Sequence, residues 1–361
     1  MITDIKKCFS LEETNRGRQP ELDLAKGLAI LFMVWTHVFE ELSPQSEGVL
    51  VTLVRNILGG PFAAPIFMIC VGIGICYSRK NTPLDLLKRG VSMLGIGLLL
   101  NVFRYVVPDL IQFAILNDPG YLDATFSLFS VDILQFVGLA FIFLAGVKKL
   151  QLKHSTLMLI GMAASALGMM LRWVSTGDYI SDQFIGFIWG TRTETYFPFL
   201  NWIIFPIAGL IFGSFLKCCR DKKTFYKRAT PICGGLMLIY LFLTIQFGFM
   251  FSSGGSYYFL GLLDSVFFII LAIAVFGVCY AVLQLFPKVS FQPLFRWSNH
   301  TNSIYCIHWT LIGMLGIVFN LLGKTKNMQF WQVTLLTAII LLLSDYLSAW
   351  YLNRIKPSWK K

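Results

Sequence analysis

An apolar stretch near the start of the chain carries three ionisable side chains that can do chemistry together. It has the sequence LDLAKGLAILFMVWTH over residues 22–37 and contains Asp23, Lys26 and His37. An ionisable group at the centre of a membrane helix costs roughly 2.5–3.5 kcal/mol on insertion scales. Histidine is the usual general base near neutral pH, and a lysine contributes to a positive site for phosphates. The stretch therefore predicts a functional site inside a membrane helix.

Helical geometry places these groups on one stripe. Lys26 and His37 share a face and are separated by a rise of roughly 16 Å, about half the hydrocarbon core. Asp23 lies one turn before Lys26, close enough to pair with it, and Glu40 lies one turn beyond His37, near enough to orient its ring. Such a stripe must face a helix bundle or a water-filled cavity, because lipid would penalise it.

Two simpler interpretations of the stripe stay open. Lys26 and Asp23 would also suit a neutralised pair at the cytoplasmic interface, with the lysine stem extended along apolar surface. His37 would also suit an interfacial histidine that donates to a carbonyl group. Helical geometry alone does not choose between these structural roles and a catalytic one.

The composition places the stretch in a membrane protein. The chain has 361 residues, of which 56% are hydrophobic and 14% charged, against about 25% charged in a soluble protein. Its mean hydropathy is +0.68. About ten apolar segments are long enough to span a bilayer: 22–42, 56–77, 86–107, 128–147, 155–173, 198–216, 230–250, 259–283, 302–322 and 329–352.

These segments predict an all-α, polytopic membrane protein. The short alternating segments of a membrane β-barrel are absent from the sequence. No soluble stretch between the spans approaches the size of a domain, so we expect residues 1–361 to form a single integral membrane domain. Residues 1–20 would form a cytoplasmic N-terminal segment.

The distribution of Lys and Arg predicts the orientation. Most of the 30 basic residues fall between spans on the side of the N-terminus. The opposite side holds only Arg55, Arg104, Arg172, Arg192, Lys324 and Lys326. Because basic residues stay in the cytoplasm, both termini are predicted to be cytoplasmic, with the first span kept as a signal anchor. The net charge of +11 follows from this topology and implies no nucleic-acid partner.

The eight cysteines give no sign of a disulfide framework or a metal site. All of them fall in spans or on the cytoplasmic side, and no metal-ligand spacing is present. Cys218 and Cys219 lie beside a membrane end, where either packing or acylation would suit them, and packing is the favoured role.

Several phrases of the sequence resemble the acyltransferase-3 family. RQPELDLAKGLAILFMVWTH resembles its first helix, with Lys26 at the usual Arg position and His37 at the His position. GGPFAAPIFMICVGIGICYSRK and TNSIYCIHW resemble its second helix and a late helix. VDILQFVGLA and FPFLNWIIFPIAGLIFG are more similar to heparan-α-glucosaminide N-acetyltransferase-type proteins of the same superfamily. Lysine at position 26 keeps the charge but loses the bidentate fork of arginine.

The resemblance implies a membrane-bound acyltransferase of the inner cell membrane. It would move an acyl group, with acetyl expected, from cytoplasmic acyl-CoA to a hydroxyl or amine of an extracytoplasmic acceptor, with a carbohydrate expected. Acetyl-CoA would be a co-substrate, and no tightly bound cofactor is expected. Direct transfer is favoured over an acyl-enzyme on His37 or a cysteine, and a homodimer is compatible with this interpretation.

Three groups of site residues follow from the resemblance and from the depth of each residue in its span. The catalytic group is His37, Glu40 and Asp132. The acyl-CoA-binding group is Lys26, Asp23, Lys88, Arg89 and His308. The acceptor-binding group is Gln135, Arg104, Arg192 and Asp264. Structural alternatives stay open for two of them: Asp132 as a helix N-cap, and His308 as the partner of Asp345 between the last two spans.

A transporter or flippase is the alternative function. Many helices, buried polar groups and the helix-breaking Gly59-Gly60-Pro61 would suit one. The two halves of the chain, 1–180 and 181–361, show no repeat. A transporter would also not need a lysine and a histidine on one helix face beside a cluster of basic residues at the cytoplasmic side. The acyltransferase is therefore favoured.

The predicted topology can be tested with reporter fusions. Fusions placed at 43–47 and at 220–224 should report opposite sides of the membrane, because an odd number of predicted spans separates them. A fusion pair that reports the same side would contradict the topology.

Overall fold

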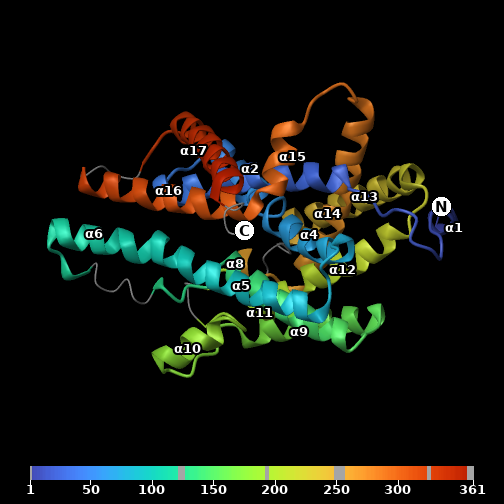
Figure 1. Ribbon diagram of the computed structural model, residues 1–361, viewed down its shortest axis with the longest axis horizontal. Coiled ribbons are helices and arrows are strands. Elements are labelled where there is room, and N and C mark those ends of the chain that lie inside the picture. Colours follow the sequence, from blue (N-terminus) through green and yellow to red (C-terminus); the bar gives the residue numbers. More distant parts are fainter. Residues whose placement is uncertain (1, 121–126, 192–194, 248–256, 323–326, 356–361) are drawn as a thin grey trace. The chain divides into compact units, whose positions relative to one another are not determined.

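The computed structural model describes residues 2–120, 127–191, 195–247, 257–322 and 327–355, which are built almost entirely from helices (Figure 1). Within these residues no β-strand is formed. Two isolated bridges, Phe9 with Cys219 and Val131 with Thr195, are the β pairings seen there. The all-α prediction is confirmed.

Eight helices of the described residues are long and apolar enough to cross a membrane. They are α2 (Pro20–Leu42), the continuous run of α5 (Pro83–Asn101), η2 (Val102–Val106) and α6 (Val107–Leu116), α9 (His154–Leu171), α11 (Phe199–Trp202) with α12 (Ile204–Lys217), α13 (Lys222–Phe247), α14 (Leu262–Leu285), α16 (Thr301–Leu321), and α17 (Phe330–Trp350) with η5 (Tyr351–Ile355). The chain is a helical, multi-pass membrane protein.

The two remaining predicted spans form shorter helices. The segment 56–77 gives α4 (Ala64–Tyr77), of 14 residues, because Gly59-Gly60-Pro61 interrupts the apolar run in a turn. The segment 128–147 gives α8 (Ile133–Lys149), of 17 residues, which starts late because Asp132 caps it. Both segments are helical as predicted, with N-termini displaced along the chain.

Short helices connect or extend these elements. They are α1 (Ile2–Lys7), α3 (Val49–Thr52), η1 (Leu53–Leu58), α10 (Tyr179–Gly186), η4 (Tyr257–Phe259) and α15 (Gln292–Asn299). Three of the η segments, η1, η2 and η5, have π-helical geometry. Turns of π-helix inside longer helices are often found at functional sites, which directs attention to η2 in the middle of its long helix.

The chain forms two compact units. The first contains Met1–Leu22, Pro65–Gly97 and Ser130–Val289, and the second contains Asp23–Ala64, Leu98–Phe129 and Ser290–Lys361. The divisions after Leu22 and Gly97 fall inside α2 and α5. Each unit is therefore discontinuous in sequence and is described separately.

In the first unit, helices approach closely at small residues. α9 packs against α11 and α12, and α13 packs against α14 (Figure 1). A Cβ atom added at Gly209 of α12 would clash with the carbonyl of Ile69 in α4, and one added at Gly72 would clash with the carbonyl of Pro206. Glycine thus lets two backbones touch, which is a common way for membrane helices to associate.

In the second unit, α2 is held on two sides. A Cβ atom added at Gly27 would clash with the backbone of Leu294, so α15 lies directly against the first part of α2. Farther along, the hydroxyl of Thr36 donates to the carbonyl of Val54 in η1, at 3.2 Å. α16 packs against α17, α6 and η2. These contacts fix the helix that carries Lys26 and His37.

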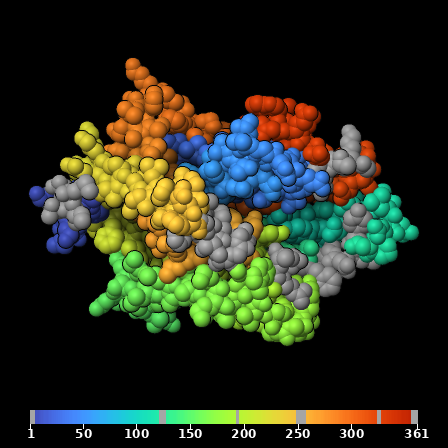
Figure 2. Space-filling model, turned by 180° about the vertical axis from the view of Figure 1, so that it is seen from behind, coloured from blue at the N-terminus to red at the C-terminus, as the bar shows by residue number. Residues whose placement is uncertain are grey.

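The outward faces of the helices are apolar. Met158, Leu159 and Met170 on α9, and Leu238 and Ile245 on α13, are exposed. Figure 2 shows α9 in green and α13 in yellow on the surface. Large apolar side chains on the outside are the arrangement expected where lipid, and not water, surrounds the helices.

Candidate active site

The site in the second unit is built around a histidine pair. Nδ1 of His37, from α2, lies 2.9 Å from Nε2 of His308, from α16. The two rings are nearly parallel, with an angle of 9° between their planes. His308 is fully buried and His37 is half-buried. The pair joins segments that are 271 residues apart in the sequence.

A contact with the backbone of α16 shows which nitrogen atoms of the pair carry protons. Nδ1 of His308 lies 2.9 Å from the carbonyl oxygen of Ile304. A carbonyl oxygen can only accept, so Nδ1 of His308 carries a proton and, in the neutral ring, its Nε2 is the acceptor. His37 must then donate from Nδ1–H. The lone pair of His37 is therefore on Nε2, the nitrogen that points away from His308 and is able to take a proton.

Aromatic side chains hold the His37 ring in place. Trp309 lies against it with ring centroids 4.2 Å apart and an angle of 26° between the planes. Tyr305 approaches edge-on, with centroids 6.5 Å apart from His37 and 5.3 Å apart from His308. Both aromatic side chains are buried. A ring confined in this way keeps one orientation, as a positioned base requires.

Arg104 meets the same tryptophan from the π-helical segment η2. Its guanidinium carbon lies 3.1 Å from the centre of a Trp309 ring and 4.7 Å from that of Tyr105. Its Nη2 is 3.4 Å from Oε1 of Glu41 at the end of α2. Arg104 was predicted to end the third span, but the helix continues through η2 to Leu116, so this buried cation lies within the helix.

A cavity of about 150 Å³ adjoins Arg104 and Trp309. Its polar lining is Glu41, Arg104, Tyr105, Asp109, Gln112 and Asn320. The amide of Asn320 donates to Oε1 of Gln112 at 2.6 Å. Trp309 lines the cavity on one side and stacks on the His37 ring on the other, so one side chain separates the cavity from His37.

The predicted residues at the start of α2 lie apart from the histidine pair. Oδ1 of Asp23 accepts a hydrogen bond from the hydroxyl of Ser298, at 2.8 Å. Lys26 is half-buried and forms no ion pair within the described residues, so the expected Asp23–Lys26 pair is not formed. α15 lies against this end of α2, and its Ser298 is one partner of Asp23.

The alternative pairing of His308 with Asp345 is wrong. Asp345 forms a two-point ion pair with Arg296, in which Nε of the arginine lies 2.9 Å from Oδ1 and Nη2 contacts Oδ2. Arg296 belongs to the short helix α15, and its fork satisfies both carboxylate oxygens. His308 is therefore left to pair with His37. The expected contact of Glu40 with the His37 ring is likewise replaced, at Nδ1, by His308.

Other predicted site residues lie in the first unit and have local partners. Asp132 and Gln135 form the capping box of α8, and Oδ1 of Asp132 accepts from the backbone N–H of Ile133 at 2.7 Å. Asp264 accepts from the hydroxyl of Tyr240 and from the backbone N–H of Gly261. The structure thus shows the N-cap role that the sequence left open for Asp132.

The basic residues at the start of α5 also belong to the first unit. Lys88 is exposed, and Nη2 of Arg89 donates to the hydroxyl of Ser78 at 2.9 Å. Arg192 lies outside the described residues. The site therefore unites His37, His308 and Arg104 from the predicted set and adds Trp309, Tyr305 and Glu41.

The sequence contained signals for the site residues that were not predicted from it. In TNSIYCIHW, Tyr305 lies one turn before both His308 and Trp309, at the i+3 and i+4 spacings whose side chains meet on a helix surface. Glu41 follows Glu40 in the last turn of α2. The π-helical turn that aims Arg104 had no such signal, because its local sequence, VFRYV, is compatible with an ordinary helix.

The fold is that of a helical multi-pass membrane protein, and a histidine pair joins two of its helices. A family model for an acyltransferase domain matches residues 19–349. That match covers most of the chain, and the chain belongs to the acyltransferase-3 family. The protein is thus a membrane acyltransferase, as the sequence resemblance predicted. No curated protein was found that matches the sequence.

The stacking of Arg104 on Trp309 is testable by a double-mutant cycle. Arg104→Ala and Trp309→Ala should each destabilise the protein, and the double variant should lose less than the sum. The coupling should be about 1–2 kcal/mol, since a desolvated cation on an indole face is worth that much. Unfolding in a mixed-detergent titration gives the four free energies. Additive losses would show that the two side chains do not interact.

Proposed function

We propose that this protein transfers an acyl group, with acetyl as the expected one, from cytoplasmic acyl-CoA to a hydroxyl or amine of an extracytoplasmic acceptor, with a carbohydrate as the expected acceptor. The observation that carries the proposal is the proton arrangement of the histidine pair, which leaves the lone pair of His37 on Nε2. Family membership supplies the reaction class. The inner cell membrane is the proposed location.

In the proposed reaction, Nε2 of His37 takes the proton of the acceptor hydroxyl or amine as that atom attacks the thioester carbonyl. The carbon–sulfur bond then breaks, and the CoA thiolate leaves with the proton that His37 holds. The acyl group is joined to the acceptor in one direct transfer, and the histidine returns to its starting state. His308 keeps the His37 ring in the correct tautomer, a role that requires no proton exchange with substrate.

The acceptor is proposed to enter the cavity beside Arg104. Its lining offers guanidinium and amide donors together with carboxylate and amide acceptors, from Arg104, Asp109, Gln112 and Asn320. A molecule with several hydroxyl groups can form hydrogen bonds with such a mixed set, whereas an apolar acceptor would form none with it. The position of Trp309 between the cavity and His37 supports placing the acceptor near His37.

The donor is proposed to bind through cytoplasmic cations. Lys26 suits this role because, among the described residues, no carboxylate neutralises it. Asp23, Lys88 and Arg89 stay predictions for the same function. Roles in the reaction also stay predictions for Glu40, Asp132, Gln135, Arg192 and Asp264.

Replacement of His37 tests the base. His37→Ala should lower turnover by about 10²–10⁴-fold, because proton removal from the acceptor is lost. His37→Gln keeps hydrogen bonding but takes no proton, so it should not restore turnover. Wild-type activity should rise with pH as the base loses its proton. The assay is mass-spectrometric detection of acyl transfer from acetyl-CoA to a panel of glycans.

The matched control for this experiment is His300→Ala, since His300 is another histidine of the second unit and stands at the N-cap position of α16 without a side-chain capping hydrogen bond. It should retain turnover. Size-exclusion behaviour should be the same for all variants. A well-folded His37→Ala protein with near-normal turnover would remove His37 from the reaction.

Replacement of His308 tests the positioning role. His308→Ala should lower kcat by about 10–100-fold with little change in KM for either substrate, because the ring of His37 loses its tautomer and orientation. His308→Gln offers an amide oxygen to Nδ1–H of His37 and should recover part of kcat. Equal kcat values for the two variants would show that hydrogen bonding to His37 is unimportant.

A further inference from the structure

The first unit contains a cavity of about 780 Å³ that the proposed reaction does not use. It lies where α4, α8 and α12 end and α9 begins, beside the N-terminal segment that precedes α2. Its floor is apolar, formed by Ile75, Leu144, Val147, Leu157 and Leu210. The volume is within the range of about 300–1,000 Å³ that is typical of ligand sites.

The rim of this cavity is basic. Lys148 is in the last turn of α8, Lys217 is in the last turn of α12, and His154 is the first residue of α9. Lys148 forms no ion pair within the part of the chain that the structure describes. Two lysines at the mouth of an apolar cavity attract an anion, since low-dielectric walls strengthen their field.

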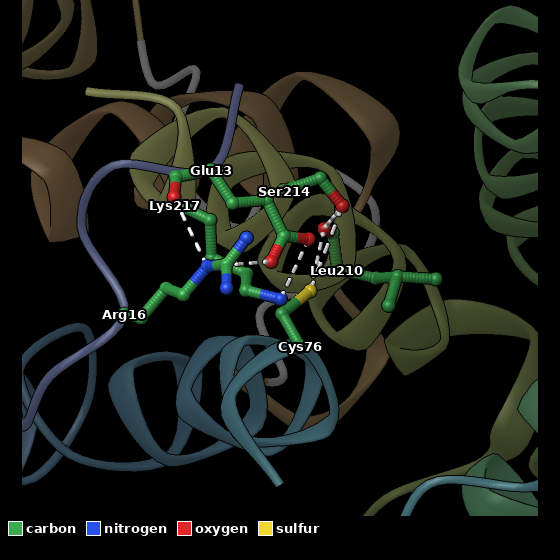
Figure 3. A network of polar contacts seen from close by, with 6 residues as sticks. All are labelled: Glu13, Arg16, Cys76, Leu210, Ser214 and Lys217. Carbon is green, nitrogen blue, oxygen red and sulfur yellow. Dashed lines mark hydrogen bonds and ion pairs between the residues drawn. The ribbon is translucent and has the colours of Figure 1, made fainter. Parts of the chain in front are cut away.

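A carboxylate of the protein already lies beside one of these lysines. Oε1 of Glu13 is 2.8 Å from Nζ of Lys217, and its other oxygen is 3.6 Å from Nε of Arg16 (Figure 3). The hydrogen bond from Lys217 holds the pKa of Glu13 below its usual value. The Glu13 side chain is nevertheless 46% exposed, so the pair is open to competition from other anions.

The backbone around Glu13 is fixed, although its side chain is exposed. The backbone N–H of Ser10 donates to the carbonyl of Cys218 at 2.9 Å, and that of Asn15 donates to the carbonyl of Lys217 at 2.8 Å. The side-chain amide of Asn15 also donates to the carbonyl of Leu216. Rotation of the Glu13 side chain alone would therefore uncover Lys217.

The interior thiol of the cavity is a hydrogen-bonding group. Sγ of Cys76 lies 3.3 Å from the carbonyl of Leu210 and 3.6 Å from the hydroxyl of Ser214 (Figure 3). A thiol that donates to a carbonyl is held in its protonated form, which is the unreactive one. The cavity is thus equipped for binding and not for covalent chemistry.

We propose that this cavity binds a ligand in which a phosphate group is joined to an apolar chain. The phosphate takes the place of the Glu13 carboxylate between Lys217 and Lys148, and the chain lies on the apolar floor. Long-chain acyl-CoA and anionic phospholipids share this chemistry. The proposal stands apart from the proposed acyl transfer, because none of the residues proposed to hold the donor there, Lys26, Lys88 and Arg89, lines this cavity. It is tested by binding alone.

Binding to the purified full-length protein in phosphatidylcholine nanodiscs tests the proposal, with palmitoyl-CoA and dipalmitoyl phosphatidic acid as separate probes. The double variant Lys148→Ala/Lys217→Ala should lose about 10–100-fold in affinity for at least one probe, as two charge-assisted contacts are removed. The probe that responds identifies the source of the phosphate. Its chain-free counterpart, CoA or glycerol phosphate, should bind at least about tenfold more weakly.

Two further variants make the test specific. Lys149→Ala removes a neighbouring cation that does not line the cavity, and it should leave affinity unchanged. Glu13→Gln has the same shape without the charge, and it should raise affinity severalfold. Thermal unfolding serves as the folding control.

Three outcomes would overturn the proposal. In the first, a folded double lysine variant binds both probes as the wild type does. In the second, Lys149→Ala loses as much affinity as the double variant, which would indicate general electrostatic attraction. In the third, Glu13→Gln binds the responding probe more weakly, which would show that the carboxylate supports the ligand and does not compete with it.

Discussion

Polar groups inside apolar helices must find partners within the protein, because lipid offers none. In the first unit Glu21 pairs with Lys222, and Asp264 accepts from Tyr240. In the second unit Arg296 pairs with Asp345. Each of these contacts joins different helices, and the pair of Glu21 with Lys222 joins two that are far apart in the sequence. The requirement for pairing therefore determines which helices meet, in addition to satisfying individual side chains.

The histidine pair also satisfies polar groups inside the protein, but it does so with neutral side chains and not with an ion pair. Two neutral rings satisfy each other through one hydrogen bond, and the carbonyl of Ile304 takes the remaining proton of His308. A carboxylate partner would have made a stronger contact but would also have favoured the charged form of the ring. Pairing with a second imidazole orients His37 while keeping its neutral form, which is the form that accepts a proton.

The sequence predicted the helices and drew attention to His37 because both signals are local, and the role of His37 in the reaction stays a prediction. Apolar runs of sufficient length define spans, and the LDLAKGLAILFMVWTH stretch carries its own spacing. The partner of His308 could not be found this way: the sequence suggested Asp345, and a pairing with His37 across 271 residues has no local signal. Arg296 forms an ion pair with Asp345, so Asp345 is not the partner of His308. Arg296 belongs to α15, a short amphipathic helix that a search for membrane spans does not detect.

The predicted ends of several helices were also wrong, and each displacement has a physical cause. Asp132 moves the start of α8 to Ile133, and Gly59-Gly60-Pro61 moves the start of α4 to Ala64. In the third predicted span, the helix continues past Arg104 through a π-helical turn. Caps, breakers and π-helical turns alter where a helix begins and which way a side chain points, while hydropathy averages over them.

The attachment of residues 8–15 along the end of α12 has a practical consequence for protein production. This segment contains no helix, and a sequence-based trimming scheme would treat it as a dispensable tail before α2. Its removal would strip hydrogen-bond partners from the carbonyls of Leu216, Lys217 and Cys218 and uncover the buried Cys219. An N-terminally shortened chain would then carry an accessible thiol next to a basic patch. Such a protein would be prone to cross-linking during purification, and affinity tags are better attached ahead of residues 8–15 than substituted for them.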